Sequence, residues 1–576
     1  MHAHLGQDSS IGAVIVLEKR LRNIPLFRDL TEESLKSIAS RLKQARYPQG
    51  AVIFREGETG DAMYLVESGQ LEVATGIAQN KQPLAYLGPG SFVGEIALLL
   101  GQPRSATLSV VIDADLWVLR KQDLEELLDE YPSLALHFTR ELGQRLVTTS
   151  HQASPPQKTP LVSVWGDYWY ELLLALANHT DGLVGLVPLV GSLPSMGRQS
   201  FVDVITSKAG VRLIEVGLTE RALTEDLSRQ IGEFDHVLLI LPPYPSAPAR
   251  KALELSDYAV NFGPAPEWIR DAIAEDCLLT CDATLESVQR VARRLTGRTV
   301  GLALSSGGSR TIAHIGVFRV LRQAGIPVDM IAGSSGGALF GALMAAGWSH
   351  AKLAEFASRL GSYNSLRNWD FNLPPRAGLL RGKRARDLIE GWLEGRQFSD
   401  LQIPLYVVAT DLATGQEIVF DSGSVADAVR ASISIPGVAD PWHYQGRFLV
   451  DGAVVNPMPA SVLHRHGAKF IIGSSVVRTA DDPGHPEFTR MPHFPQIISR
   501  ITSSMETERI KAQFPLVDVL IHPPVFVDHA LDFSQADTLI GLGEEAARQE
   551  LAECERQLIE ARVLHRRITM SAHAAE

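Results

Sequence analysis

The stretch AGSSGGAL at residues 332–339 constrains the fold of this chain more than any other. The apolar run DMIAG leads into it and the small-residue run GALFGALMAAG follows, which predicts a strand, a tight turn and a helix. Ser335 stands in that turn between Gly333 and Gly337, and glycines allow a sharp bend with close packing. The pattern predicts either a nucleophilic serine at a helix start or a glycine-rich turn with an incidental serine.

The α/β pattern extends to the preceding residues. TVGLALSS reads as a buried strand and AHIGVFRVLRQAG as a helix, with SSGGSR (305–310) between them. Consecutive small residues at a helix start expose backbone N–H groups, as an oxyanion hole requires. An ordinary turn between a strand and a helix is the alternative.

A candidate base lies further along the chain. GRFLVDGAVVNPMPA places Asp451 at the end of an apolar strand, where a carboxylate can project from the edge of a sheet. Asp-Gly is also typical of a simple turn. Residues 335 and 451 are far apart in the chain, so only folding can bring them together.

Five motifs occur in order, and together they point to a family. They are SSGGSR, AHIGV, GSSGG, AVRASISIPGV and VDGAVVNP. In this order they resemble the patatin-like phospholipases, especially the bacterial and neuropathy-target-esterase-like branch, over about residues 298–480 and more weakly to about 560. The resemblance implies hydrolysis of phospholipid or lysophospholipid acyl esters, with Ser335 acylated and Asp451 as base. It implies no catalytic histidine, metal or required cofactor.

The same resemblance assigns supporting residues. It implies that the backbone amides of Gly307, Gly308 and Ser309 hold the oxyanion. The remaining motif residues are Gly333, Gly337, Arg310 and Gly452. The chain departs from the family loop Gly-Gly-Gly-x-Arg-Gly at Ser306 and Thr311, and from Asp-Gly-Gly at Ala453. We expect Arg310 to hold the loop.

A Ser–His–Asp triad is the rival mechanism, with the histidine after the acid. The histidines in suitable positions are His464, His466, His485, His493 and His522. None of them lies in a recognisable motif.

The N-terminal region has a different pattern. AVIFREGETGDAMYLVESGQLEVA contains short β-rich runs separated by glycines, which indicates a β-roll. FVGEIALLLGQPRSATL then resembles the phosphate-binding cassette of cyclic-nucleotide-binding domains. The resemblance implies that Glu95 takes the ribose 2′-hydroxyl, and that Arg104, Gly94 and Ser105 take the cyclic phosphate. Cyclic AMP or cyclic GMP is therefore the candidate regulatory ligand.

The expected organisation is multidomain. It comprises a cyclic-nucleotide-binding-like β-roll with flanking helices, a linker, an α/β spacer, a patatin-like α/β hydrolase domain and its C-terminal extension, at 24–150, 151–160, 161–297, 298–480 and 481–565. The alternation of strand and helix patterns in the spacer implies a parallel sheet without nucleotide motifs. A catalytically weak or dead cyclic-nucleotide sensor or scaffold is the alternative function.

Composition limits the partners and the compartment. The net charge of -12 argues against a nucleic-acid partner. Cys277, Cys281 and Cys554 are the three cysteines and suit a reducing compartment; Cys277 and Cys281 lack a second ligand pair nearby. The longest apolar run, 182–193, is broken by Pro188 and too short to span a bilayer. We expect a cytoplasmic protein whose membrane contact, at its lipid substrate, is peripheral; the sequence leaves the oligomeric state open.

Overall fold

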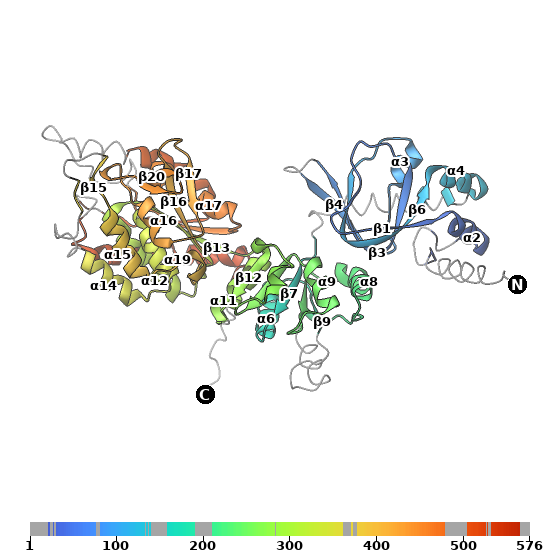
Figure 1. The fold of residues 1–576 in the computed structure, drawn as a ribbon, viewed down its shortest axis with the longest axis horizontal. Helices are drawn as coiled ribbons and strands as arrows, with labels where there is room; N and C mark the ends of the chain where they lie inside the picture. The colour runs from blue at the N-terminus through green and yellow to red at the C-terminus, as the bar shows by residue number, and fades with distance from the viewer. Residues whose placement is uncertain are drawn as a thin grey trace, which may run out of the picture. The chain divides into compact units, whose positions relative to one another are not determined.

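The structure is a computed structural model. It describes residues 21–22, 27, 30–76, 81–132, 134–135, 138–139, 158–189, 210–282, 284–360, 370–372, 377–477, 504–525, 527 and 532–564. Contacts divide the chain into two compact units, Met1–Leu285 and Glu286–Glu576. Figure 1 shows their helices and strands. Of the expected linker, residues 151–157 lie outside the described part of the chain.

The first unit begins with the β-roll that the sequence predicts (Figure 1). Its elements are α2 (Glu32–Arg41), β1 (Lys43–Tyr47), β2 (Val52–Phe54), β3 (Ala62–Thr75), β4 (Gln82–Leu87), β5 (Phe92–Val93), α3 (Glu95–Leu100), β6 (Thr107–Arg120) and α4 (Lys121–Glu130). The antiparallel order is β1-β6-β3-β4, with β2 on β6 and β5 on β3. Buried and partly buried residues alternate along most of β6, because successive side chains of a strand point to opposite faces.

A parallel α/β layer follows in the same unit. Its elements are β7 (Leu161–Trp165), α6 (Trp169–His179), β8 (Val184–Pro188), β9 (Val211–Leu213), α8 (Glu220–Gln230), β10 (His236–Ile240), α9 (Ala247–Leu255), β11 (Tyr258–Phe262), α10 (Glu267–Arg270) and β12 (Leu278–Cys281). The sheet order is β12-β11-β7-β10-β8-β9, and all of its pairs are parallel. This is the parallel sheet that the alternating strand and helix patterns of the spacer imply.

The second unit is built on an eight-stranded sheet. Its helices are α11 (Leu285–Leu295), α12 (Ala313–Gln323), α13 (Gly336–Ala345), α14 (His350–Leu360), α15 (Lys383–Leu393), α16 (Val425–Ser432), α17 (Ala460–Arg465) and α19 (Ala536–Glu560). Its strands are β13 (Val300–Leu304), β14 (Met330–Ser334), β15 (Gly378–Leu380), β16 (Leu405–Asp411), β17 (Glu417–Phe420), β18 (Gly437–Ala439), β19 (Trp442–Tyr444), β20 (Arg447–Asp451), β21 (Phe470–Ser474) and β22 (Val519–Ile521).

The strand order of this sheet is β19-β20-β16-β14-β13-β21-β22, with β17 on β16. Strands β16, β14, β13, β21 and β22 run parallel, and β17, β19 and β20 add antiparallel pairs. All five residues of β13 and of β14 are buried, as expected for central strands covered on both faces. The multidomain fold class predicted from the sequence is confirmed.

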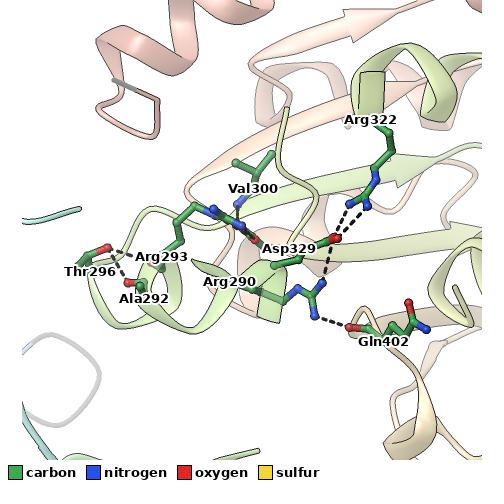
Figure 2. A network of polar contacts seen from close by, with 9 residues as sticks. Arg290, Ala292, Arg293, Thr296, Val300, Arg322, Asp329 and Gln402 are labelled. Atoms are coloured by element: carbon green, nitrogen blue, oxygen red, sulfur yellow. Dashed lines mark hydrogen bonds and ion pairs between the residues drawn. The ribbon is translucent and has the colours of Figure 1, made fainter. Parts of the chain in front are cut away.

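Helix α11 is anchored to the starts of the two central strands (Figure 2). Arg293 of α11 donates from Nε and Nη2 to the carboxylate of Asp329, at distances of 2.6–3.1 Å. Asp329 Oδ2 also accepts the Val300 N–H at 2.9 Å. These bonds attach α11 to β13 and β14. Residues 286–297, which the sequence assigned to the middle region, therefore have their contacts in the second unit.

The C-terminal helix α19 packs closely on α12 in the second unit (Figure 1). A Cβ on Gly316 would lie 2.0 Å from the Ile540 carbonyl oxygen, and one on Gly543 2.0 Å from that of Ala313. Only glycine fits at both positions because the two backbones approach so closely. The crossing fixes α12, which follows the glycine loop of the candidate site.

Candidate active site

Ser335 lies between β14 and α13, and its backbone is strained. Its φ is 55° and its ψ is −126°, a conformation that non-glycine residues rarely adopt. A Cβ on Gly333 would lie 2.6 Å from the Gly337 carbonyl oxygen. A Cβ on Gly337 would lie 2.5 Å from the Leu304 oxygen. The glycines are therefore required for the turn that presents the Ser335 hydroxyl at the end of β14.

Asp451 ends β20, and its carboxylate accepts a hydrogen bond from the Ser335 hydroxyl. The Oγ–Oδ2 distance is 2.7 Å, although 116 residues separate the two in sequence. Only β16 lies between β20 and β14 in the sheet, and the register pairs Asp451 with Ala409 of β16. The sheet order thus brings together the two residues that the sequence could not place in contact.

The pair is shielded from solvent. Ser335 is 6% exposed and Asp451 3% exposed. Burial raises the pKa of Asp451 to about 6, while the Ala453 N–H at 2.9 Å and the Ser335 hydroxyl oppose that shift. No cationic side chain of the described residues hydrogen-bonds this carboxylate. Asp451 is therefore a stronger base than an ordinary aspartate.

Two further serines hold the backbones of this pair. The Ser335 N–H donates to Ser432 Oγ at 2.9 Å, and Ser432 Oγ donates to the Val408 carbonyl at 2.6 Å. The Asp451 N–H donates to the Ser434 carbonyl at 3.0 Å. Both serines lie in AVRASISIPGV, which the sequence singled out as a motif without assigning roles to individual residues.

The glycine loop lies against the Ser335 turn. A Cβ on Gly336 would lie 3.0 Å from the Gly308 carbonyl oxygen. Within the described part of the chain, the N–H groups of Gly307 and Gly308 have no hydrogen-bond acceptor, and Ser309 is buried beside them. The Ser306 N–H donates to the Pro457 carbonyl at 2.7 Å. Gly307 and Gly308 thus retain backbone donors that a substrate oxygen can use.

Side chains of the loop make bonds within it. Arg310 is buried and donates from Nε to the Gly307 carbonyl at 3.0 Å. Thr311, where the family loop has glycine, donates from its hydroxyl to the Gly308 carbonyl at 2.5 Å. A Cβ on Gly452 would meet the Val408 carbonyl oxygen at 2.2 Å, so the glycine after Asp451 is required.

His314 is a buried histidine that sequence reasoning did not single out. Its Nδ1 lies 2.7 Å from Ser474 Oγ, and its Nε2 lies 3.0 Å from the Ser305 carbonyl oxygen. The carbonyl can only accept, so Nε2 carries the proton and Nδ1 accepts from Ser474. Burial lowers the pKa of His314 to about 4, so the ring is neutral at pH 7. His314 links the ends of β13 and β21 beneath the glycine loop.

Of the histidines of the rival triad, the structure describes His464, His466 and His522. His466 stacks on Tyr406 with ring centroids 4.0 Å apart. No imidazole of the described residues hydrogen-bonds either member of the Ser335–Asp451 pair. His485 and His493 lie outside the described residues.

The β-roll holds a buried arginine at its candidate phosphate site. Arg104 is 3% exposed and donates to the carbonyls of Gly94 at 3.0 Å and Ala62 at 2.7 Å. Its guanidinium lies 4.0 Å from the centre of the Phe54 ring. Its Nε is buried without a hydrogen-bond partner among the described residues. This unused donor fits an anionic group such as a phosphate.

Gly94, Glu95 and Ser105 are the other residues that the sequence assigned to this phosphate site. Gly94 has a φ of 88° and precedes α3, which Glu95 begins. Glu95 is buried, whereas Ser105 is exposed beside Arg104. The structure thus places Gly94 and Arg104 in direct contact, with Glu95 next in the chain.

The described residues contain neither a metal-ligand cluster nor a helix suited to span a membrane. No group of three or more His, Cys, Asp or Glu side chains is arranged to hold a metal ion there. Across the same residues, no helix has the length and apolar character needed to cross a bilayer. Cys277, Cys281 and Cys554 form no disulfide within the described part of the chain.

The fold and these sites define an α/β domain with a buried serine–carboxylate pair, in a chain that also carries a β-roll with a buried arginine. The sequence matches the family model described as Patatin-like phospholipase over residues 302–464. It matches the model described as Cyclic nucleotide-binding domain over residues 44–131.

Several curated proteins are similar to this chain. An uncharacterized NTE family protein of Mycobacterium tuberculosis is 26% identical over 92% of this chain and 96% of its own length. Patatin-like phospholipase domain-containing protein 7 of Rattus norvegicus is 27% identical over 74% of this chain and 38% of that protein. Lysophospholipase nte1 of Aspergillus fumigatus is 26% identical over 81% of this chain and 37% of that protein.

Residues 302–464 therefore match a patatin-like phospholipase domain and residues 44–131 a cyclic nucleotide-binding domain, and the chain is similar to an NTE family protein over most of its length. The family and enzyme class predicted from the five motifs and the cassette are confirmed.

Proposed function

We propose that this protein is a serine acyl-ester hydrolase of phospholipids or lysophospholipids that acts through Ser335 and Asp451. The observation that carries the proposal is the 2.7 Å hydrogen bond from the strained serine to a buried carboxylate of raised pKa. The names of its relatives, a phospholipase domain-containing protein and a lysophospholipase, support the substrate class.

Acylation begins with Ser335. Asp451 Oδ2 accepts the hydroxyl proton while Ser335 Oγ attacks the ester carbonyl carbon. The carbonyl oxygen becomes an oxyanion, held by the backbone N–H groups of Gly307, Gly308 and Ser309. When the intermediate collapses, the bond to the alcohol oxygen breaks and Asp451 returns its proton to that oxygen. The products are a free alcohol and acyl-Ser335.

Deacylation repeats the proton transfers with water. Asp451 takes a proton from water as the hydroxyl attacks the acyl carbon, and the same amides hold the second oxyanion. The bond to Ser335 Oγ then breaks, and Asp451 protonates the serine. A fatty acid leaves, and the serine and carboxylate return to their starting state.

The direct test is hydrolysis of mixed phospholipids by the purified protein, with analysis of the products. We expect free fatty acid from the wild type and none from Ser335→Ala. Ser358→Ala is the matched control, because Ser358 is an exposed helix serine bonded only to the Ala354 carbonyl. A fluorophosphonate should label Ser335. Labelling of another serine would contradict the assignment.

The alternative, a catalytically weak or dead sensor, is supported by the altered glycine loop with Ser306 and Thr311. The same assay separates the two functions. No acyl release from any phospholipid or lysophospholipid, together with no labelling of Ser335, would favour the sensor.

We further propose that a cyclic nucleotide binds the roll through Glu95 and Arg104 and regulates hydrolysis. The buried Arg104 with its unused Nε supports a phosphate there. Calorimetry with cyclic AMP and cyclic GMP should show binding that Arg104→Ala weakens strongly. No heat at millimolar ligand would contradict the binding.

Coupling to hydrolysis is a separate step of that proposal. Typical coupling of about 1–3 kcal/mol would change substrate affinity roughly 5- to 150-fold. Glu95→Ala and Arg104→Ala should remove the response and leave basal hydrolysis unchanged. Binding without any change in rate or substrate affinity would contradict the coupling.

We propose that the protein is cytoplasmic and that it contacts the membrane peripherally, at its lipid substrate. Cell fractionation followed by a salt or carbonate wash tests this location. We expect protein in the soluble and washable membrane fractions; wash-resistant protein would contradict peripheral contact.

A further inference from the structure

At Thr311 the glycine loop departs from the family pattern, and the side chain that stands there makes two contacts. Thr311 is buried, and its hydroxyl donates to the Gly308 carbonyl at 2.5 Å. A Cβ on Gly336 would lie 3.0 Å from Thr311 Cγ2, so the threonine also lies against the residue that follows Ser335. Thr311 therefore contacts both the loop with the candidate oxyanion donors and the turn with the candidate nucleophile.

The hydrogen bond from Thr311 is one of a series along the loop. Four consecutive carbonyls, those of residues 305–308, each accept a hydrogen bond from a buried side chain. In chain order of the carbonyls, the donors are His314 Nε2 at 3.0 Å, Ser305 Oγ at 2.9 Å, Arg310 Nε at 3.0 Å and Thr311 Oγ1 at 2.5 Å. The backbone of the loop is thus held by side chains at every one of these peptide units.

A held carbonyl also fixes the direction of the N–H that follows it. A trans peptide unit is planar, so its C=O and N–H point in opposite directions. The carbonyls of residues 306–308 share their peptide units with the N–H groups of Gly307, Gly308 and Ser309, the candidate oxyanion donors. The Ser305, Arg310 and Thr311 side chains therefore set the directions of these three N–H groups.

The loop is attached to its surroundings as well. Ser305 Oγ, which holds the Ser306 carbonyl, also accepts the Val476 N–H at 2.9 Å. The Ser306 N–H donates to the Pro457 carbonyl at 2.7 Å. The loop is thus tied to the residues that follow β21 and to the segment that follows Asp451, besides its contact with the Ser335 turn.

We propose that Ser305, Arg310 and Thr311 are positioning residues that hold the oxyanion donors in place before substrate binds. The inference rests on the proposed esterase function. Thr311 is the member that tests it best, because glycine, the family residue at this position, has no hydroxyl to hold the Gly308 carbonyl. The departure at Thr311 then adds a hydrogen bond that organises the site, which opposes the interpretation of the altered loop as a dead one.

The expected effect is on the transition state rather than on substrate binding. Donors that are already aimed at the developing oxyanion stabilise it without reorganisation. Removing one oxyanion donor outright costs about 10²- to 10³-fold in kcat. Freeing the carbonyl behind a donor leaves the donor present but less well aimed, so we expect a smaller loss of about tenfold, with KM little changed.

The test measures kcat and KM of Thr311 variants on a soluble p-nitrophenyl ester. Thr311→Val keeps the shape and loses the hydroxyl, so its kcat should fall by about tenfold. Thr311→Ser keeps the hydroxyl and should retain most of the activity. Thr311→Gly restores the family residue and should lose at least as much as Thr311→Val. Wild-type kcat in Thr311→Val or Thr311→Gly would overturn the inference.

Thr299→Val is the matched control. Thr299 is also buried, and its hydroxyl donates to the Gly467 carbonyl at 2.6 Å. It directly precedes β13, whereas the glycine loop directly follows that strand. Thermal unfolding of the full chain should show comparable losses of stability in the two valine variants, but Thr299→Val should keep kcat. Equal losses of kcat in both would overturn the inference, since they would reflect stability alone.

A trifluoromethyl ketone supplies a second measurement. Ser335 Oγ adds to the ketone carbon, Asp451 takes the hydroxyl proton, and the ketone oxygen becomes an oxyanion at the same N–H groups. Thr311→Val should weaken this inhibitor by about the factor that it takes from kcat/KM, because the adduct resembles the transition state. Unchanged inhibition beside a lowered kcat would overturn the inference. Absence of both hydrolysis and fluorophosphonate labelling in the wild type would instead overturn the esterase function itself.

Discussion

Two aspartates in the second unit are almost completely buried, and their surroundings differ in one respect. Asp329, 1% exposed, stands at the start of β14 and receives bonds from the Arg293 guanidinium (Figure 2). Asp451, at the end of β20, receives hydrogen bonds from the Ala453 N–H and the Ser335 hydroxyl and from no cation of the described residues. One buried charge is paired with a cation and the other is not.

The difference separates stability from chemistry. A paired buried carboxylate is costly to break, because removing either partner leaves the other charge buried alone. An unpaired buried carboxylate binds a proton more readily, which suits a general base but opposes folding at neutral pH. The same residue type therefore fastens α11 in one place and, in the other, has the raised pKa that suits the proposed general base.

Replacing Asp451 or its partner Ser335 should have the largest effect, on the rate of hydrolysis. Ser335→Ala and Asp451→Asn should each lower kcat by about 10⁴-fold or more, and the double variant should lose little beyond the larger single loss. The two residues act as one unit, so their effects do not multiply. Release of fatty acid by the purified variants measures this. Multiplied losses would show that the two residues act independently.

Replacing Asp329 should instead lower the stability of the folded protein. Asp329→Asn should lower the free energy of unfolding by about 3–5 kcal/mol, because Arg293 keeps a buried charge without its partner. Thermal unfolding of the full chain measures the loss. Glu553→Gln is the control, since its pair with Arg556 is solvent-exposed and its loss should leave the unfolding temperature nearly unchanged.

A double variant tests whether the unpaired charge causes this loss of stability. Arg293→Met combined with Asp329→Asn should recover part of the stability that Asp329→Asn alone loses, since no buried charge remains. Equal losses in the single and double variants would show that the pairing of charges is unimportant there.

The Asp451 carboxyl should make the folded protein less stable as the pH rises. Its folded pKa of about 6 lies above the ordinary value of 3.8, so the folded state binds the proton more tightly. Stability from this group is fully present below about pH 4 and is lost as the pH rises through about 6. Asp451→Asn should thus raise the unfolding free energy at pH 8 by about 2–3 kcal/mol. A variant less stable than the wild type at pH 8 would contradict an unpaired carboxylate.

The smallest expected effects are those of the histidines. Replacing His464, His466, His485, His493 and His522 singly should change the rate by less than about tenfold. If one of these histidines were catalytic, its imidazolium would pair with Asp451, just as a cation already pairs with Asp329. Loss of turnover in one folded variant would therefore support the Ser–His–Asp triad and contradict the unpaired Asp451 carboxylate.

Sequence reasoning singled out Ser335 and Asp451 as candidates because their signals are local. Ser335 lies in a strand–turn–helix pattern, and Asp451 ends an apolar strand within a recognisable motif. The supporting residues His314, Ser432 and Ser434 were missed as individuals. A buried histidine or serine looks in sequence like any other polar residue on a helix, and its partners come from distant strands.

Fold class was easier to predict, because parallel strands buried on both faces give continuous apolar runs that alternate with helical ones.

The sequence by itself determined the elements and the chemistry available to them. Turns, buried strands and glycines at positions of close approach depend on neighbouring residues, so they can be read along the chain. Only the tertiary structure decided which groups meet and how they ionise. The order β20-β16-β14 brought Asp451 to Ser335, and burial without a cation raised its pKa, because desolvation depends on everything packed around a group.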